Sequence, residues 1–132
     1  MVWREARTDE ARALHASDPA ICVWWATRTE CASVLARLFR EGRLSESEAT
    51  VLRDRLSRLF KDFQEIDPSE SLRLRAERLL SVHPLRTADA LQLAAALMWT
   101  DERPSQRPLV SLDRRLREAA QKEGFTLLPV GL

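Results

Sequence analysis

The chain has few of the residues that build common cofactor and metal sites. Its 132 residues include only three glycines, which excludes a glycine-rich phosphate loop and argues against a nucleotide cofactor. Cys22 and Cys31 are the only cysteines and form no CxxC pair, and His15 and His83 stand alone in the sequence. We therefore expect two reduced, packed thiols, with neither a zinc site nor a disulfide.

A long apolar run and a strong net charge are also missing. No stretch of about 18 apolar residues is present, and the first residues show no signal-peptide pattern, so we expect a cytoplasmic protein without a membrane segment. The 21 basic residues nearly balance the 20 acidic ones, and the net charge of +1 gives no overall attraction to nucleic acid. With 45% hydrophobic residues, the chain is expected to form a single domain over residues 1–132.

The most apolar stretch runs from Ala88 to Trp99 and is interrupted only by Asp89 and Gln92. A helix that is apolar all round is buried on all sides, so this stretch is expected to form a central helix. Thr87 is a good N-cap, and the helix should begin near it. Asp89 then lies in the first turn, where attraction to the positive end of the helix dipole is by itself a sufficient explanation for an acid.

Short apolar runs alternate with helical patterns along the rest of the chain. Strands are expected at residues 20–25, 63–67, 109–111 and 126–130. Helices are expected at residues 8–16, 27–41, 45–62, 67–81, 87–99 and 113–123. Several ends carry capping signals, including a Ser45/Glu48 capping box, Asp67 as an N-cap and Gly42 after a helix. About four strands and six helices in alternation predict an α/β fold with a parallel sheet covered on both faces.

Three acids occupy equivalent places in this pattern. Glu30 and Asp113 each lie at the start of a helix that follows a strand, and Asp89 opens the central helix. In a parallel sheet, the carboxyl ends of the strands and the starts of the following helices face one edge, so the three carboxylates are predicted to converge there. Capping remains an alternative for each, because Thr27 and Glu30 have capping-box spacing and Asp113 is a good N-cap.

Convergence of three carboxylates would require a counter-charge. Two unpaired carboxylates about 5 Å apart repel by roughly 3 kcal/mol at an effective dielectric near 20. That is a large part of a typical domain stability of about 5–15 kcal/mol. Oxygen ligands without cysteine or histidine select Mg²⁺ or Mn²⁺, and carboxylate-held Mg²⁺ is suited to phosphodiester hydrolysis.

Three segments together resemble the PIN-domain proteins, especially the VapC-type toxin ribonucleases. They are residues 27–37 (TRTECASVLAR), residues 86–97 (RTADALQLAAAL) and residues 109–125 (LVSLDRRL, then AA and GF). The resemblance implies a three-layer α/β/α sandwich with a central parallel sheet, and a Mg²⁺- or Mn²⁺-dependent ribonuclease acting on RNA. Glu30, Asp89 and Asp113 match the second, third and fourth acids of that family's site, as catalytic and metal-binding residues. An antitoxin partner and a homodimer are also implied.

The chain departs from that family at its start. PIN domains of this type open with a central strand that carries the first aspartate. Residues 1–5 (MVWRE) resemble the segment after that strand, and neither Glu5 nor Asp9 lies at a matching place. Two hypotheses follow. Either the natural reading frame starts upstream of Met1, or the sheet closes differently and the nuclease is impaired.

Two other functions are compatible with the sequence. The first is a non-catalytic PIN-like binding module, whose acidic groove takes a basic antitoxin segment or which only dimerises; the missing first acid favours it. The second is an ordinary α/β domain in which the acids only cap helices. Arg86 is a candidate contact to an RNA backbone or a partner of Asp89. Trp24 and Trp25 are expected to be core and flank residues rather than platforms for bases.

Overall fold

The computed structural model describes residues 13, 16 and 20–131. Its elements in chain order are β1 (Cys22–Trp24), α2 (Thr27–Arg40), α3 (Glu46–Lys61), β2 (Gln64–Ile66), α4 (Glu70–Val82), α5 (Thr87–Trp99), a 3₁₀ turn (Pro104–Gln106), β3 (Leu109–Val110), α6 (Arg114–Lys122) and β4 (Leu127–Leu128). The helix expected at residues 8–16 lies almost wholly outside the described residues, as do Glu5 and Asp9. No helix in the described part has both the length and the apolar character to span a membrane.

The four strands form two separate parallel pairs in the part of the chain that the structure describes. β1 pairs with β2, with Cys22 opposite Gln64, and β3 pairs with β4, with Leu109 opposite Leu127. Each strand lies within its predicted range, and the parallel orientation is the predicted one. The predicted single sheet is instead divided between β1 and β3, because no described strand joins these two edges.

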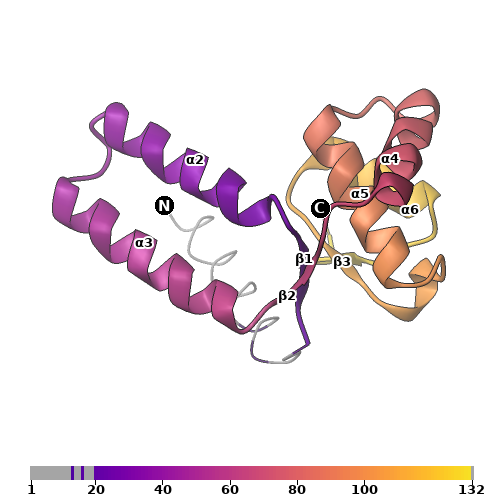
Figure 1. The fold of residues 1–132 in the computed structure, drawn as a ribbon, viewed down its shortest axis with the longest axis horizontal. Coiled ribbons are helices and arrows are strands. Elements are labelled where there is room, and N and C mark those ends of the chain that lie inside the picture. The colour runs from indigo at the N-terminus through magenta and orange to yellow at the C-terminus, as the bar shows by residue number, and fades with distance from the viewer. Residues whose placement is uncertain (1–12, 14–15, 17–19, 132) are drawn as a thin grey trace.

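Helix α5 is the centre of the hydrophobic core, as its composition predicted. It contacts α4, α6 and β1 (Figure 1). Five of its residues are buried: Ala90, Leu93, Ala94, Ala95 and Leu97. The helix begins at Thr87, but its N-cap is Arg86 rather than Thr87. The predicted cap is therefore wrong by one residue, because the Asp89 carboxylate reaches back to the Arg86 amide at 3.3 Å and stabilises a start one residue earlier.

Helix α4 begins later than the sequence pattern predicted. Its N-cap is Ser69, whose Oγ accepts a hydrogen bond from the Leu72 amide at 3.2 Å. The predicted N-cap, Asp67, lies just after β2 and outside the helix. Serine and aspartate are comparable N-caps, so the sequence alone did not separate the two positions.

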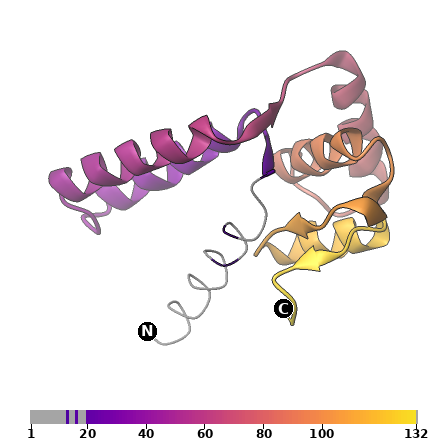
Figure 2. The same ribbon diagram turned by 90° about the horizontal axis from the view of Figure 1, so that it is seen from below.

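Helices α2 and α3 form a hairpin that extends away from the body built by α4, α5 and α6 (Figures 1 and 2). The predicted capping box is present, since the Ser45 amide donates to Glu48 Oε2 at 2.7 Å and the Glu48 amide to Ser45 Oγ at 3.2 Å. Gly42 has a φ of 71°, as expected after a helix end. Among the described elements α2 packs mainly against α3, and Val34 and Phe39 on α2 are 44% and 43% exposed.

Candidate active site

Two of the three predicted acids lie together, where α2 meets α5. Glu30 is in the first turn of α2, shortly after β1 ends, and Asp89 is in the first turn of α5. Gln92, one turn after Asp89, donates a hydrogen bond from Nε2 to Glu30 Oε2 at 2.7 Å. The negative charge of Asp89 lies close enough to contribute to a raised pKa of the Glu30 carboxyl. Glu30 thus lies near Asp89, although only α2 follows a strand, whereas α5 follows α4.

The pKa of the Glu30 carboxyl is raised above its ordinary value of 4.5. Burial is the main cause, because a poorly solvated site disfavours the charged form. The hydrogen bond from Gln92 opposes the rise, and repulsion by Asp89 adds to it. Burial and the charge of Asp89 thus both disfavour the charged form of Glu30.

Capping does not account for Glu30. The N-cap of α2 is Ala26, which makes no side-chain cap hydrogen bond, so the alternative Thr27/Glu30 capping box is not formed. The Glu30 carboxylate instead contacts a side chain of another helix. Asp89 does cap, since its Oδ2 accepts the weak bond from Arg86. Its Oδ1 receives no hydrogen bond from a described residue, so one oxygen remains for a ligand.

Asp113 is the N-cap of α6, as its alternative reading predicted. Its Oδ1 accepts a hydrogen bond from the Leu116 amide at 2.8 Å, and its own amide donates to Ser111 Oγ at 3.1 Å. It lies at the end of β3, where the sequence placed it. Among residues 13, 16 and 20–131, however, no three Asp, Glu, His or Cys side chains lie close enough together to hold one metal ion. The structure thus brings Glu30 and Asp89 together without Asp113.

Replacing Asp113 by alanine should lower the free energy of unfolding by about 1 kcal/mol, because the Leu116 amide loses its acceptor. Asp113→Asn keeps an accepting oxygen and should retain most of this stability. Urea unfolding of the two variants and the wild type measures the difference. Equal stability of wild type and Asp113→Ala would contradict a capping role.

Gln92 is a site residue to which the sequence assigned no role. It and Asp89 are the only polar residues between Ala88 and Trp99, and their spacing of three places them on one face of α5. That face meets α2 at Glu30. The sequence did contain a clue to this contact. Two polar residues at helical spacing in an otherwise apolar helix indicate that this face meets a polar group of a neighbouring element.

The two tryptophans take the places expected of core and flank residues. Trp24 is 7% exposed and belongs to the core, whereas Trp25, one residue beyond β1, is 51% exposed. Their rings make an edge-on contact with centroids 6.4 Å apart. Trp25 is therefore held beside the core without being covered by it.

Neither cysteine has the character of a reactive ligand. Cys22 and Cys31 are free and half-buried, and burial raises the pKa of both thiols. A raised pKa lowers the thiolate population that metal binding or nucleophilic attack requires. His83 is buried and hydrogen-bonded to Glu123 Oε1 at 2.6 Å, where it links the end of α4 to the end of α6. His15 lies outside the described residues.

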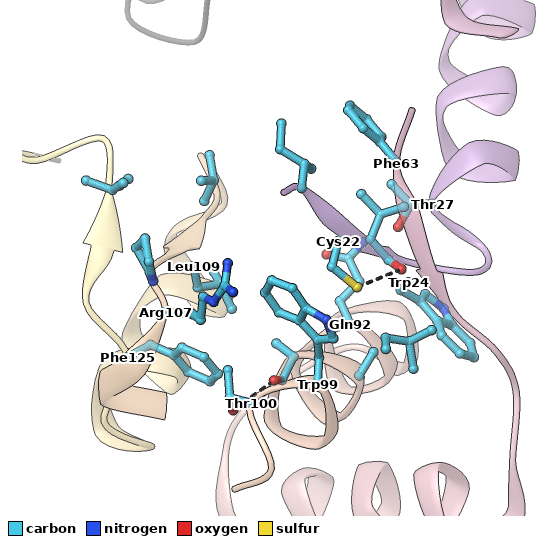
Figure 3. Close-up of a pocket in the computed structure, with 18 of the residues that line it drawn as sticks. Cys22, Trp24, Thr27, Phe63, Gln92, Trp99, Thr100, Arg107, Leu109 and Phe125 are labelled. Atoms are coloured by element: carbon cyan, nitrogen blue, oxygen red, sulfur yellow. Dashed lines mark hydrogen bonds between the residues drawn. The ribbon is translucent and has the colours of Figure 1, made fainter. Parts of the chain in front are cut away.

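A cavity of about 590 Å³ lies between β1 and β3, with α5 as its floor (Figure 3). Helix α5 contributes Gln92 and Trp99 to the lining, among other residues, and the Arg107 guanidinium lies 4.8 Å from the centre of the Trp99 ring. Glu30, Asp89 and Asp113 do not line the cavity. Gln92 lines the cavity and also donates a hydrogen bond to Glu30. The acid pair therefore lies next to the cavity, with the Gln92 side chain between them.

Comparison with known proteins identifies the family. The family model of the PIN domain matches residues 2–122. Neither the curated proteins nor the solved structures gave a match. PIN domains are α/β proteins and generally divalent-metal-dependent nucleases that act on RNA, often paired with antitoxins. Because this match spans most of the chain, the chain belongs to the PIN domain family.

Proposed function

We propose that this protein is a metal-dependent endoribonuclease of the VapC type, the toxin of a cytoplasmic toxin–antitoxin pair. The observation that carries the proposal is the contact between Glu30 and Gln92 beside Asp89, which keeps two carboxylates together across two helices. Membership of the PIN family supports the reaction class. The resemblance of the three segments to VapC-type toxins supports an antitoxin partner and a homodimer.

The donor chemistry fits Mg²⁺ or Mn²⁺. Glu30 and Asp89 offer only carboxylate oxygens, which these ions prefer. Such an ion supplies an activated water and neutralises charge at the phosphate. Gln92 orients the Glu30 carboxylate. Asp113 caps α6 through Oδ1 and, as the described residues are arranged, does not share an ion with Glu30 and Asp89.

Among the described residues no strand lies between β1 and β3, and we infer that this gap is the place of the family's first strand with its aspartate. A strand in that position would join the two parallel pairs into the single central sheet of a three-layer α/β/α sandwich. It would also fix Asp113, which follows β3, relative to Glu30, which follows β1. The separation of Asp113 from the other two acids is therefore a consequence of the divided sheet.

A non-catalytic binding module is the second candidate. The observation that favours it is the lack of a three-acid cluster among the described residues. Two carboxylates hold a divalent ion more weakly than three or four, and they position its water less well. Such a domain would retain the PIN fold and bind an antitoxin or a second copy without cleaving RNA.

Thermal unfolding with and without millimolar Mn²⁺ tests the proposal. If the ion concentration is about tenfold above its Kd, binding should stabilise the chain by about 1.4 kcal/mol, which raises the unfolding midpoint by several degrees. Asp89→Asn should abolish the rise, whereas Asp54→Asn, an exposed acid on α3, should not. Mn²⁺-dependent cleavage of RNA should follow the same pattern. A chain that unfolds cooperatively but shows no rise would exclude the metal site and favour the binding module.

A further inference from the structure

The charges of the α2–α3 hairpin are distributed unevenly along its length. Its root, where α2 begins and α3 ends next to the strands, comprises residues 27–34 and 53–61 (Figure 1). The root carries two acids, Glu30 and Asp54. It carries five basic side chains: Arg28, Arg53, Arg55, Arg58 and Lys61. The tip, residues 35–52, carries three side chains of each sign. The hairpin is therefore basic at the end that holds Glu30 and balanced at the end that projects from the body (Figure 2).

Three of the basic residues form a continuous row on the surface of α3. Arg55, Arg58 and Lys61 are spaced three apart, and side chains at this spacing are neighbours on a helix, with about 5–6 Å between Cβ atoms. All three are exposed, and none forms an ion pair with a described residue. Asp54 lies one turn before Arg58 but does not pair with it. We call Arg55, Arg58 and Lys61 the α3 basic row.

The helix dipole accounts for only part of the α3 basic row. Arg58 and Lys61 lie in the last turn of α3, where the negative end of the dipole favours cations. Arg55 lies one turn earlier, and the effect of the dipole falls off within the last turn. The dipole therefore does not explain why the row begins where it does.

A row of unpaired cations suits a partner with repeated negative charges. The net charge of the whole protein is only +1, so a polyanion would be held by a local basic surface rather than by overall attraction. Lysine and arginine bind nucleic-acid phosphates with release of counterions, and the planar guanidinium of arginine matches the geometry of a phosphate. Two of the three residues in the row are arginines. The row also lies on the half of the hairpin that holds Glu30.

We propose that the α3 basic row binds the phosphate backbone of RNA and holds the strand at the root of the hairpin, near Glu30 and Asp89. The inference rests on the proposed ribonuclease function, which makes RNA the polyanion that must reach these acids. It adds a binding surface that lies outside the acid pair. Contacts to phosphates carry no sequence information, so the row positions an RNA strand without selecting its bases.

Fluorescence anisotropy of a labelled single-stranded oligouridylate tests this surface. The full chain is titrated in EDTA, so that no divalent ion is present and the RNA stays intact. The triple variant Arg55→Gln/Arg58→Gln/Lys61→Gln should bind about tenfold or more weakly at about 50 mM NaCl. Each phosphate contact to a single strand contributes about 0.7 to the slope of log affinity against log salt, so between about 50 and 200 mM NaCl the slope should fall by about 2.

The triple variant Arg78→Gln/Arg115→Gln/Lys122→Gln is the matched control. It removes the same three charges from exposed positions on α4 and α6 that form no ion pair with a described residue. Lys122 lies in the last turn of its helix, as Lys61 does. Because only the overall charge changes, RNA affinity should fall by less than about threefold. Circular dichroism confirms that both variants are folded.

Four results would overturn the proposal. The first is no binding of the oligouridylate by folded wild-type protein. The second is equal weakening by the two triple variants, which would mean a general effect of charge. The third is a lower unfolding midpoint of the row variant with unchanged RNA affinity, which would leave only the dipole role. The fourth is a polyglutamate peptide that binds as tightly as the RNA and depends equally on the row, which would assign the surface to an acidic protein partner.

The Mn²⁺ experiment tests the acid pair separately from this surface. A row variant that keeps the Mn²⁺-dependent rise in the unfolding midpoint but loses RNA affinity supports the proposal. RNA binding that depends on the row, in a chain that shows no response to Mn²⁺, would reject the metal site and retain the surface. A response to Mn²⁺ without RNA binding that depends on the row would reject the surface and retain the metal site.

Discussion

Replacing Arg117 by methionine should lower the free energy of unfolding by about 3 kcal/mol. Arg117 is only 7% exposed, and its guanidinium donates to three backbone carbonyls. Nη1 bonds to Ser111 at 2.7 Å and to Leu128 at 3.0 Å, and Nη2 bonds to Pro129 at 2.9 Å. Hydrogen bonds from a charged donor contribute about 1.5–3 kcal/mol each but are not additive. Methionine fills a similar volume, so the decrease in the free energy of unfolding measures mainly the effect of leaving the three carbonyls without a donor.

A matched control lies on the same helix. Arg114 is 89% exposed and forms an i,i+4 ion pair with Glu118 at 2.9 Å. Such a surface pair contributes about 0.3–0.5 kcal/mol, so Arg114→Met should have little effect. Urea unfolding with fitted midpoints and slopes measures both variants. Similar small losses for the two substitutions would show that Arg117 does not hold the ends of β3 and β4 together.

The role of Arg117 was not predictable from the sequence. Arg114, Arg115 and Arg117 are indistinguishable as residue types in the segment RRLR, and all three suit a solvated helix surface. Helical periodicity places Arg117 next to the buried Leu116, but the carbonyls it bonds to come from the ends of two strands. A contact of this kind depends on how a helix and a strand pair meet, for which no local signal exists.

Local signals were sufficient for most elements. The apolar composition of Ala88–Trp99 predicted the buried α5, and the Ser45/Glu48 spacing predicted the start of α3. These features depend on residues within a few positions of one another. The sheet depends on distant pairings, and alternation of strands and helices predicts parallel strands without saying which edges meet. The division between β1 and β3 was therefore visible only in the structure.

The same distinction holds for the candidate site. Glu30 and Asp89 come together because α2 follows β1 and β1 packs on α5, an arrangement that the buried character of both segments favours. Asp113 has the predicted local position at the start of α6. Its distance from the other acids, however, is set by the spacing of β1 and β3. The sequence contains no pattern from which the spacing of β1 and β3 could be predicted.

Glu30→Gln should stabilise the metal-free chain at neutral pH. The pKa of Glu30 is raised mainly by burial, and further by Asp89 against the hydrogen bond from Gln92. Below pH 4.5 the carboxyl is mostly protonated in both the folded and the unfolded chain, so it does not lower the free energy of unfolding. As the pH rises above 4.5, the unfolded chain releases the proton first, and the wild type loses stability until the raised pKa is passed. A glutamine avoids this loss and can still accept the bond from Gln92.

Glu46→Gln is the matched control, because Glu46 is also a first-turn acid, at the exposed start of α3. It should destabilise slightly, since it loses a favourable interaction with the helix dipole. Thermal unfolding of the wild type and both variants between pH 4 and pH 8, without metal, shows whether each substitution raises or lowers the stability of the chain. A loss of stability in Glu30→Gln that matches Glu46→Gln would mean that Glu30 is an ordinary helix-terminus acid.

The same Glu30→Gln variant should lose function while gaining stability. Removing groups that only orient ligands costs about 10- to 100-fold in metal affinity, so replacing a ligand itself should cost about 100-fold or more. Mn²⁺ titration of the unfolding midpoint, and of RNA cleavage where the wild type cleaves, measures this loss. Stability and metal response moving in opposite directions is the signature of carboxylates held together to bind a cation, because a capping or core residue would lose stability when replaced. An unchanged Mn²⁺ response would mean that Glu30 is not a metal ligand. Asp89 would then be the remaining candidate ligand.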